Sequence, residues 1–272
     1  MPINKINAIN LYWELTGSKG EPLVLIHGSW GDHHNWDGVV GELSKSFRVL
    51  TYDRRGHSQS ERLNTQGNTE EDVSDLVALI EYLNLSPAHI AGNSFGACIA
   101  LKTAAGRPEL FKTLVIHEPP LLGLLKDVPE VQPMLQTVNN RVEAVMQLIV
   151  KGNNEEAAKQ FVETIALGPG TWQHLPLQVQ QTFIYNAITW YDEIQDHGSL
   201  SMDTSKLFNF NKPALFTNGT ESPPFFLMIL QQLTKAIPGA RRITFEGAGH
   251  VPHMSNPVQY IEAVKDFCIT NQ

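Results

Sequence analysis

The sequence predicts an α/β fold in which a mostly parallel sheet is flanked by crossover helices and carries an inserted helical cap. Through the first 120 residues, short apolar runs of strand length alternate with segments of helical period, and this alternation resumes near residue 213. The chain has 272 residues, of which 42% are hydrophobic and 18% are charged. This balance is typical of one water-soluble globular domain.

The predicted strands and helices follow one another in a regular order. The strand-like runs cover residues 23–27, 47–53, 89–93, 113–118, 213–219 and 241–247. Helices are expected at about 35–43 and 69–83, from Ser94 onward, and at about 257–268. Because parallel strands need a crossover between them, this order predicts a parallel sheet with right-handed connections.

The pattern changes after residue 120. Residues 121–205 contain no strand-like run but several amphipathic segments, among them VEAVMQLIV and EEAAKQFVETIA. We therefore predict a core domain formed by residues 1–120 and 206–272, with a helical cap at 121–205 inserted into it.

Charge and composition narrow the possible partners. The formal net charge is −8 and the two signs are mixed along the chain, which argues against a nucleic-acid partner. The amino terminus has no targeting pattern and no segment approaches the roughly 20 apolar residues that cross a bilayer, so we expect a cytoplasmic protein without membrane contact. Cys98 and Cys268 stand outside any metal-ligand spacing and are expected to be buried thiols.

The segment HIAGNSFGACIAL contains the candidate nucleophile, Ser94. It reads G-x-S-x-G between an apolar strand and a helical run, a context typical of a serine presented on a sharp turn. Gly92 and Gly96 leave room for neighbouring chain at that turn. Serine can also act only as a helix cap, but the flanking elements and a late histidine favour a nucleophile.

His250 is the expected general base. It stands in the glycine-rich loop of TFEGAGHVPHMSNP, between the last strand and the last helix. A neutral imidazole within hydrogen-bond reach can remove a serine proton near pH 7. His253 lies closer to the helix start and is expected to be a packing or surface residue.

The segment LIHGSWG follows the first long strand and is expected to supply half of an oxyanion hole, through the backbone amide of Ser29. The second donor would be the amide of Phe95, at the start of the helix after Ser94. His27 is expected to be structural. We expect the neighbouring pair His33 and His34 to be surface or cap-facing.

The segments HGSWG, DRRGHSQS, GNSFGA and GAGH together resemble the α/β-hydrolase family over essentially the whole chain. The resemblance implies the α/β-hydrolase fold, with a mostly parallel eight-stranded sheet. It also implies a catalytic acid, usually after the seventh strand and three positions beyond a glycine. Here Ser222 occupies that position, counted from Gly219, so the usual assignment fails.

A carboxylate after the sixth strand is the alternative, and Glu118 ends the run TLVIHE. Its setting, followed by two prolines, is similar to that of the acid in zearalenone-type lactone hydrolases, and some haloalkane dehalogenases also place their acid there. The resemblance therefore assigns Glu118 to accept the Nδ1 proton of His250. Glu221 is the rival, because one residue of loop adjustment could bring it to the same histidine.

Other residues suggest roles more weakly. Asp53 also ends a strand, but the resemblance assigns its stretch, TYDRRGHSQS, to a turn supported by an aspartate and an arginine. Trp30, beside the oxyanion strand, and Trp172 and Trp190 in the cap are expected to line the substrate pocket. No metal and no cofactor is expected.

The sequence thus predicts a serine hydrolase, an esterase or lactonase, that cleaves a small-molecule carboxylic ester or lactone through an acyl-enzyme intermediate. Two alternatives remain open. The stretch YDRRGHSQS resembles that of the nonhaem haloperoxidases, so cofactor-free perhydrolase activity would use the same triad. A ligand receptor on a hydrolase scaffold could also retain these residues. The sequence leaves the oligomeric state undetermined.

Overall fold

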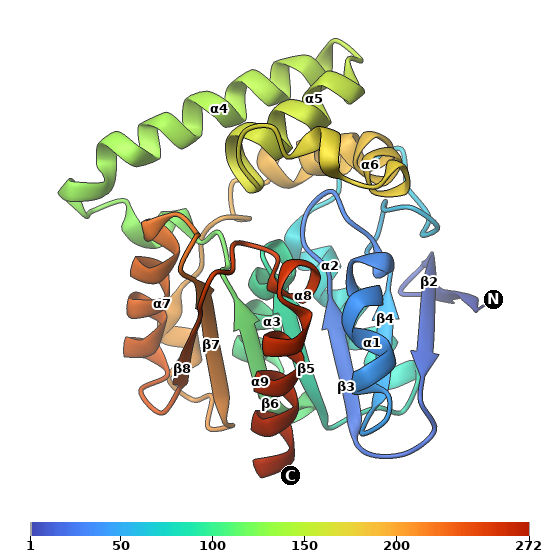
Figure 1. Ribbon diagram of the computed structural model, residues 1–272. Helices are drawn as coiled ribbons and strands as arrows, with labels where there is room; N and C mark the ends of the chain where they lie inside the picture. The colour runs from blue at the N-terminus through green and yellow to red at the C-terminus, as the bar shows by residue number, and fades with distance from the viewer. Residues whose placement is uncertain (1, 272) are drawn as a thin grey trace.

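The apolar runs of the chain form the central strands of one sheet. The computed structural model describes residues 2–271, and its eight-stranded sheet has the order β1-β2-β4-β3-β5-β6-β7-β8 (Figure 1). The strands are β1 (Ile3–Ile6), β2 (Ile9–Thr16), β3 (Pro22–Ile26), β4 (Arg48–Tyr52), β5 (Ala88–Asn93), β6 (Phe111–His117), β7 (Ala214–Gly219) and β8 (Arg241–Phe245). The strands from β3 to β8 run parallel, which confirms the predicted fold class.

The hairpin at the amino terminus was not located from the sequence. β1 pairs with β2, and β2 pairs with β4, both in antiparallel register. These strands form the edge of the sheet, and β2 is only partly buried, so it has no continuous apolar run. A half-exposed antiparallel strand gives a weaker sequence signal than a central parallel strand.

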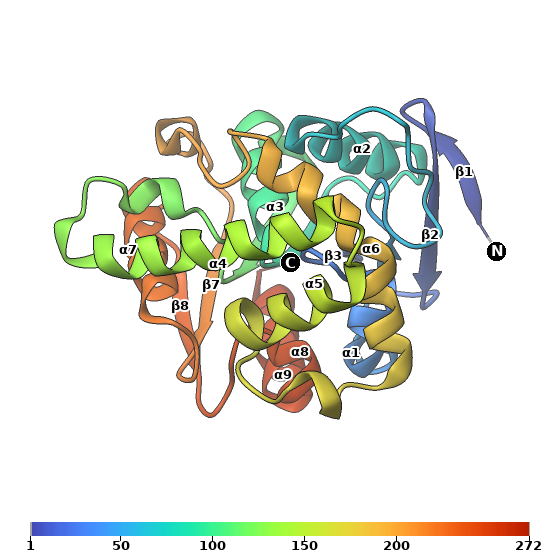
Figure 2. The ribbon, with the colours of Figure 1, turned by 90° about the horizontal axis from the view of Figure 1, so that it is seen from above.

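Helices cover both faces of the sheet. The α-helices are α1 (Asp37–Leu43), α2 (Thr69–Tyr82), α3 (Phe95–Gly106), α4 (Gln132–Val150), α5 (Asn154–Phe161), α6 (Leu177–Gln195), α7 (Pro224–Ala236), α8 (Pro252–Ser255) and α9 (Pro257–Thr270). Residues of α2, α3 and α7 share one core cluster, and residues of α1 and α9 share a second on the opposite face (Figure 2). α7 was not located from the sequence. The short α8 was not predicted either. The other helices of the core begin within about two residues of their predicted positions, except that the first opens with a 3₁₀ turn at His33–Trp36.

Residues 121–205, which we refer to as the cap, contain α4, α5 and α6 and, among the described residues, no strand. These helices lie over the carboxyl ends of the central strands (Figure 1). A third core cluster joins Trp30 of the sheet domain to apolar side chains of the cap. The division into core and cap domains stays a prediction, but this arrangement encloses the sheet edge where open α/β sheets bind ligands.

Within residues 2–271, no helix is long and apolar enough to cross a membrane.

Candidate active site

Ser94 joins β5 to α3 in a left-handed backbone conformation, with φ of 56° and ψ of −124°. This region is uncommon for a residue with a side chain and costs on the order of 1–3 kcal/mol. The amide of Ser94 donates a hydrogen bond to the carbonyl of His117 at the end of β6 (2.9 Å). The neighbouring strand therefore holds the turn in its strained conformation.

Glycines make this turn possible. A Cβ atom at Gly92 would lie 2.4 Å from the carbonyl oxygen of Gly96, and one at Gly96 would lie 2.2 Å from the carbonyl oxygen of Ile26. Any side chain at these positions would force β5, α3 and β3 apart. A Cβ atom at Gly28 would lie 2.9 Å from Cβ of Ser94, so the loop after β3 passes directly beside the serine.

His250 lies in the loop after β8 and contacts an acid from another strand. Its Nδ1 is 2.7 Å from Oε2 of Glu118, which follows β6. The ring of Phe226 stacks on the imidazole, with 4.8 Å between centroids. Asn93, the neighbour of Ser94, donates a hydrogen bond from Nδ2 to the carbonyl of His250 (2.9 Å). Side chain and backbone of His250 are thus held from three directions.

The carboxylate of Glu118 is completely buried. Burial by itself would raise its pKa, but the hydrogen bond from His250 and the nearby His117 outweigh this effect and lower the pKa to about 2. Its Oε1 accepts a hydrogen bond from the amide of Gly219 (2.8 Å). An ionised carboxylate can only accept, so Nδ1 of His250 carries the proton and Nε2 is left as the basic nitrogen.

The rival acid, Glu221, lines one cavity with Ser94 and His250 but, in the part of the chain that the structure describes, is not bound to the histidine. The side chain of Glu221 is exposed, and its amide donates to the carbonyl of Ala248 (2.9 Å). Among the described contacts, Glu221 makes no hydrogen bond or ion pair with His250. The geometry therefore brings Glu118, and not Glu221, to the histidine.

Ser94 and His250 line the same cavity, which has a volume of about 1040 Å³ and lies between the cap and the sheet. Ser29 lines it beside them. Most of the remaining lining residues belong to the cap, and most of the lining surface is apolar, with contributions from Phe161, Ile165, Leu167, Leu175, Val179 and Phe183. Polar side chains of the cap also line the cavity, among them Asn140, Arg141, Gln160 and Glu163. A few convergent polar groups in a largely apolar cavity are characteristic of a small-molecule site.

The two expected oxyanion donors come from different loops: Ser29 lies in the loop after β3, and Phe95 follows Ser94 directly in the chain. Phe95 is the first residue of α3, where helix amides have no partner within the helix and can bind an anion. Ser29 follows Gly28, which packs against the serine. Ser29 lines the cavity with Ser94, and Phe95 is the next residue after Ser94, so the oxyanion role of both amides stays a prediction.

The structure corrects the expectation for three tryptophans. Trp30 is fully buried and stacks on Phe161 with 4.7 Å between centroids, while Trp172 and Trp190 pack in the same cap cluster. None of the three is among the residues that line the cavity. Trp30 has a left-handed backbone conformation (φ 67°), and its ring lies in the cap cluster. The aromatic residues that line the cavity are Phe161 and Phe183.

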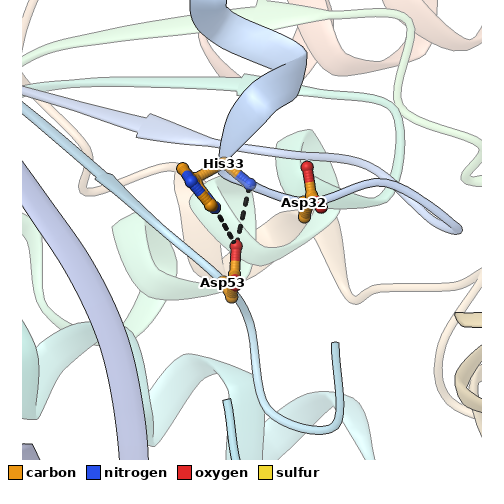
Figure 3. Close-up of side chains that lie close together, drawn as sticks. All are labelled: Asp32, His33 and Asp53. Carbon is orange, nitrogen blue, oxygen red and sulfur yellow. Dashed lines mark hydrogen bonds and ion pairs between the residues drawn. The ribbon is translucent and has the colours of Figure 1, made fainter. Parts of the chain in front are cut away.

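Asp53 belongs to a buried network behind the loop after β3. Its Oδ1 accepts hydrogen bonds from the amide of His33 (2.9 Å) and from Nδ1 of the same residue (2.6 Å), as Figure 3 shows. Asp32 lies beside them, and both carboxylates already accept hydrogen bonds at each oxygen. This grouping therefore links two loops through hydrogen bonds. The expectation of a surface or cap-facing His33 is wrong, because the histidine is buried against Asp53.

The other histidines differ in their surroundings. His27 is buried and its Nε2 accepts a hydrogen bond from the amide of Arg54 (3.0 Å). Burial and the charge of Arg54 lower the pKa of His27 to about 3, so this ring is neutral. His253 is buried against the ring of Trp36, and the side chain of His34 is exposed. Each of these three has the surroundings of a packing or surface residue.

Glu193 of α6 is a buried acid that contacts Ser29 and was not predicted, because no local motif marks it. The one sequence feature that relates it to the site is its spacing from Asn186, since residues seven positions apart lie on the same face of a helix.

These features are those of a known fold family. The model of the alpha/beta hydrolase fold family matches residues 21–257, and the chain therefore belongs to this family. The chain is 30% identical over 174 residues to the uncharacterized hydrolase YraK of Bacillus subtilis, covering 62% of this chain and 64% of that protein. The match thus spans less than two thirds of that relative's length.

Two further similarities extend over nearly the whole chain. The chain is 26% identical to the (E)-2-((N-methylformamido)methylene)succinate hydrolase of Acinetobacter baylyi, over 91% of this chain and 90% of that enzyme. An alpha/beta hydrolase from Sphaerobacter thermophilus superimposes with a TM-score of 0.78 at 25% identity, covering 98% of this chain and 100% of that structure.

Proposed function

We propose that this hydrolase cleaves a carboxylic ester or lactone, with Ser94 as nucleophile, His250 as general base and Glu118 as the acid that orients it. The observation that carries the proposal is the 2.7 Å hydrogen bond between Glu118 and His250, in a site where Ser94 lines the same cavity. An imidazole bound to a buried carboxylate, with a serine lining the same cavity, is the set of groups that acyl transfer requires.

The reaction begins when Nε2 of His250 takes the hydroxyl proton of Ser94 as Oγ attacks the carbonyl carbon. The amides of Ser29 and Phe95 hold the negative charge that develops on the carbonyl oxygen, and each such donor contributes on the order of 3 kcal/mol. The imidazolium gives its proton to the departing alkoxide, which leaves an acyl group on Ser94. His250 then activates water in the same way, and the carboxylic acid is released.

Glu118 supports both proton transfers. Because its pKa is about 2, it is ionised at neutral pH and stabilises the imidazolium that forms in each half-reaction. The large apolar cavity is suited to a substrate with a bulky hydrocarbon portion beside its carbonyl group.

A fluorophosphonate probe tests the nucleophile directly. We expect one adduct per chain on the wild-type protein, located at Ser94 by peptide mass spectrometry, and none on Ser94→Ala. A wild-type protein that stays unlabelled would favour a ligand receptor on this scaffold. Hydrolysis of p-nitrophenyl esters of increasing chain length, measured beside peracid formation from hydrogen peroxide and acetate, separates hydrolase from perhydrolase activity.

A further inference from the structure

The cap helix α6 reaches into the sheet domain at the loop that follows β3. We refer to residues 28–31 as the oxyanion loop. Asn186 of α6 donates hydrogen bonds from Nδ2 to the carbonyls of Trp30 (3.2 Å) and Gly31 (2.9 Å). Glu193 lies seven positions further on, and so on the same face of the helix. One face of α6 therefore holds both ends of this loop.

Glu193 contacts the loop at the residue expected to donate to the oxyanion. The hydroxyl of Ser29 donates a hydrogen bond to Oε2 of Glu193 (2.5 Å), across 164 positions of sequence. The glutamate is only 7% exposed. A hydroxyl bound to a buried carboxyl group makes a hydrogen bond that fixes its rotamer, and above a pH of about 7, where Glu193 is ionised, this bond is charge-assisted.

The other oxygen of the same carboxylate is bound to Arg54, which stands behind the second donor. Oε1 of Glu193 accepts a hydrogen bond from Nη2 of Arg54, and the guanidinium lies 4.8 Å from the ring centroid of Phe95. The amide of Arg54 is also bound to the ring of His27, at the start of the oxyanion loop. A single carboxylate thus connects the surroundings of both donors.

We infer that Glu193 is a positioning residue: by binding the hydroxyl of Ser29 and the guanidinium of Arg54, it sets the distance between the two oxyanion donors. This inference rests on the proposed function, because it concerns the geometry of that oxyanion hole. Donors are effective only at about 2.7–3.1 Å from the oxyanion. A small shift of the loop therefore reduces the stabilisation of the transition state more than it reduces the affinity for substrate.

Ser29→Ala tests the link from the loop side. It removes the hydroxyl, keeps the backbone amide, and leaves the pair between Glu193 and Arg54 intact, so the fold is preserved. On p-nitrophenyl acetate we expect kcat to fall by roughly 10-fold with KM nearly unchanged, less than the 100-fold or more that follows loss of a whole donor. Ser29→Thr restores the hydroxyl and should recover most of kcat.

Glu193→Gln tests the link from the cap side. Glutamine keeps the shape of the side chain but loses the negative charge that binds Ser29 and Arg54. Because it weakens the contact that Ser29→Ala removes, Ser29→Ala should lower kcat less in the double variant than in the wild type. Asp192→Asn is the matched control. Asp192 neighbours Glu193 and also binds the sheet domain, through Arg62 (2.6 Å), but does not contact the oxyanion loop. We expect its kcat to equal that of the wild type.

The inference is overturned if Ser29→Ala retains the wild-type kcat, if it raises only KM, or if the two substitutions multiply in the double variant. It is also overturned if Asp192→Asn lowers kcat as much as Glu193→Gln, since the effect would then belong to cap docking in general. Fluorophosphonate labelling of Ser94 in each variant distinguishes failure of this inference from failure of the proposed function. A labelled Ser94 with unaltered Ser29→Ala kinetics defeats this inference alone, whereas an unlabelled wild type defeats the proposed function as well.

Discussion

Oε2 of Glu118 lies 2.7 Å from Nδ1 of His250, although 132 positions separate the two residues along the chain. The contact spans the width of one strand, because Glu118 follows β6 and His250 follows β8, with β7 between them. Glu118 itself has a left-handed backbone (φ 46°), and the amide of Gly219 at the end of β7 holds its second oxygen. The sheet thus directs this carboxylate toward the histidine.

Replacing Glu118 should show its role most clearly. Glu118→Ala leaves Nδ1 of His250 without its acceptor and removes the charge that stabilises the imidazolium, so we expect kcat to fall by about 10³–10⁴-fold. Steady-state hydrolysis of p-nitrophenyl acetate measures this, and Glu221→Ala is the comparison, expected to remain within about twofold of wild type. A large loss of kcat with Glu221→Ala and a small one with Glu118→Ala would show that Glu221 is the catalytic acid.

The turn at Ser94 should tolerate no added methyl group at Gly96. Gly96→Ala places Cβ 2.2 Å from the carbonyl oxygen of Ile26, so we expect a loss of about 3 kcal/mol or more in the free energy of unfolding. Gly106→Ala in the same helix meets nothing within 4 Å and should change stability by less than about 1 kcal/mol, in the stabilising direction. Urea unfolding followed by circular dichroism compares the two variants. Equal midpoints would contradict this account of the turn.

Trp30 should contribute stability through the cap cluster. Trp30→Ala removes a fully buried ring that packs on Phe161 and Trp190, and we expect it to cost roughly 3–5 kcal/mol. Tyr185→Ala, on the exposed face of α6, should stay within about 0.5 kcal/mol of wild type. Thermal unfolding distinguishes these outcomes, and a wild-type melting temperature for Trp30→Ala would place the ring outside the core.

The buried cluster around Arg54 predicts a pH dependence of stability. Burial raises the pKa of Glu193 from 4.5 to about 7, against the opposing charge of Arg54, and burial likewise raises that of Asp72 to about 6. His57 and Asp192 complete the titratable groups around Glu193. A raised carboxyl pKa contributes stability that is fully present below about 4.5 and is lost as pH rises through 7.

We therefore expect Glu193→Gln to flatten the fall in unfolding free energy between pH 4.5 and 7, as measured by urea titrations at several pH values. Glu118 acts with the opposite sign. Its pKa is lowered to about 2, so its contribution is present above about 4.5 and is lost as pH falls toward 2. A variant Glu193→Gln with the wild-type slope over pH 4.5–7 would show that this carboxyl does not titrate in that range.

Much of the site could be predicted because its signals are local. The turn at Ser94 requires glycines two residues before and after it, and the parallel strands on either side give continuous apolar runs. Glu118 follows such a strand and His250 follows the last predicted strand, so the order of the elements predicted that both residues lie at the same edge of the sheet. The half-exposed hairpin β1–β2 gave no comparable signal.

Local sequence was enough to predict the succession of strands along the chain, the sharp turn at Ser94 and the residues that end those strands, because glycine geometry and apolar periodicity act over a few neighbouring positions. The packing of Trp30 into the cap, the exposure of Phe161 to the cavity and the contact between Glu193 and Ser29 are visible only in the folded molecule. These features depend on how α6 docks on the sheet domain. Docking is set by side-chain packing between segments more than 100 positions apart, which no local pattern records.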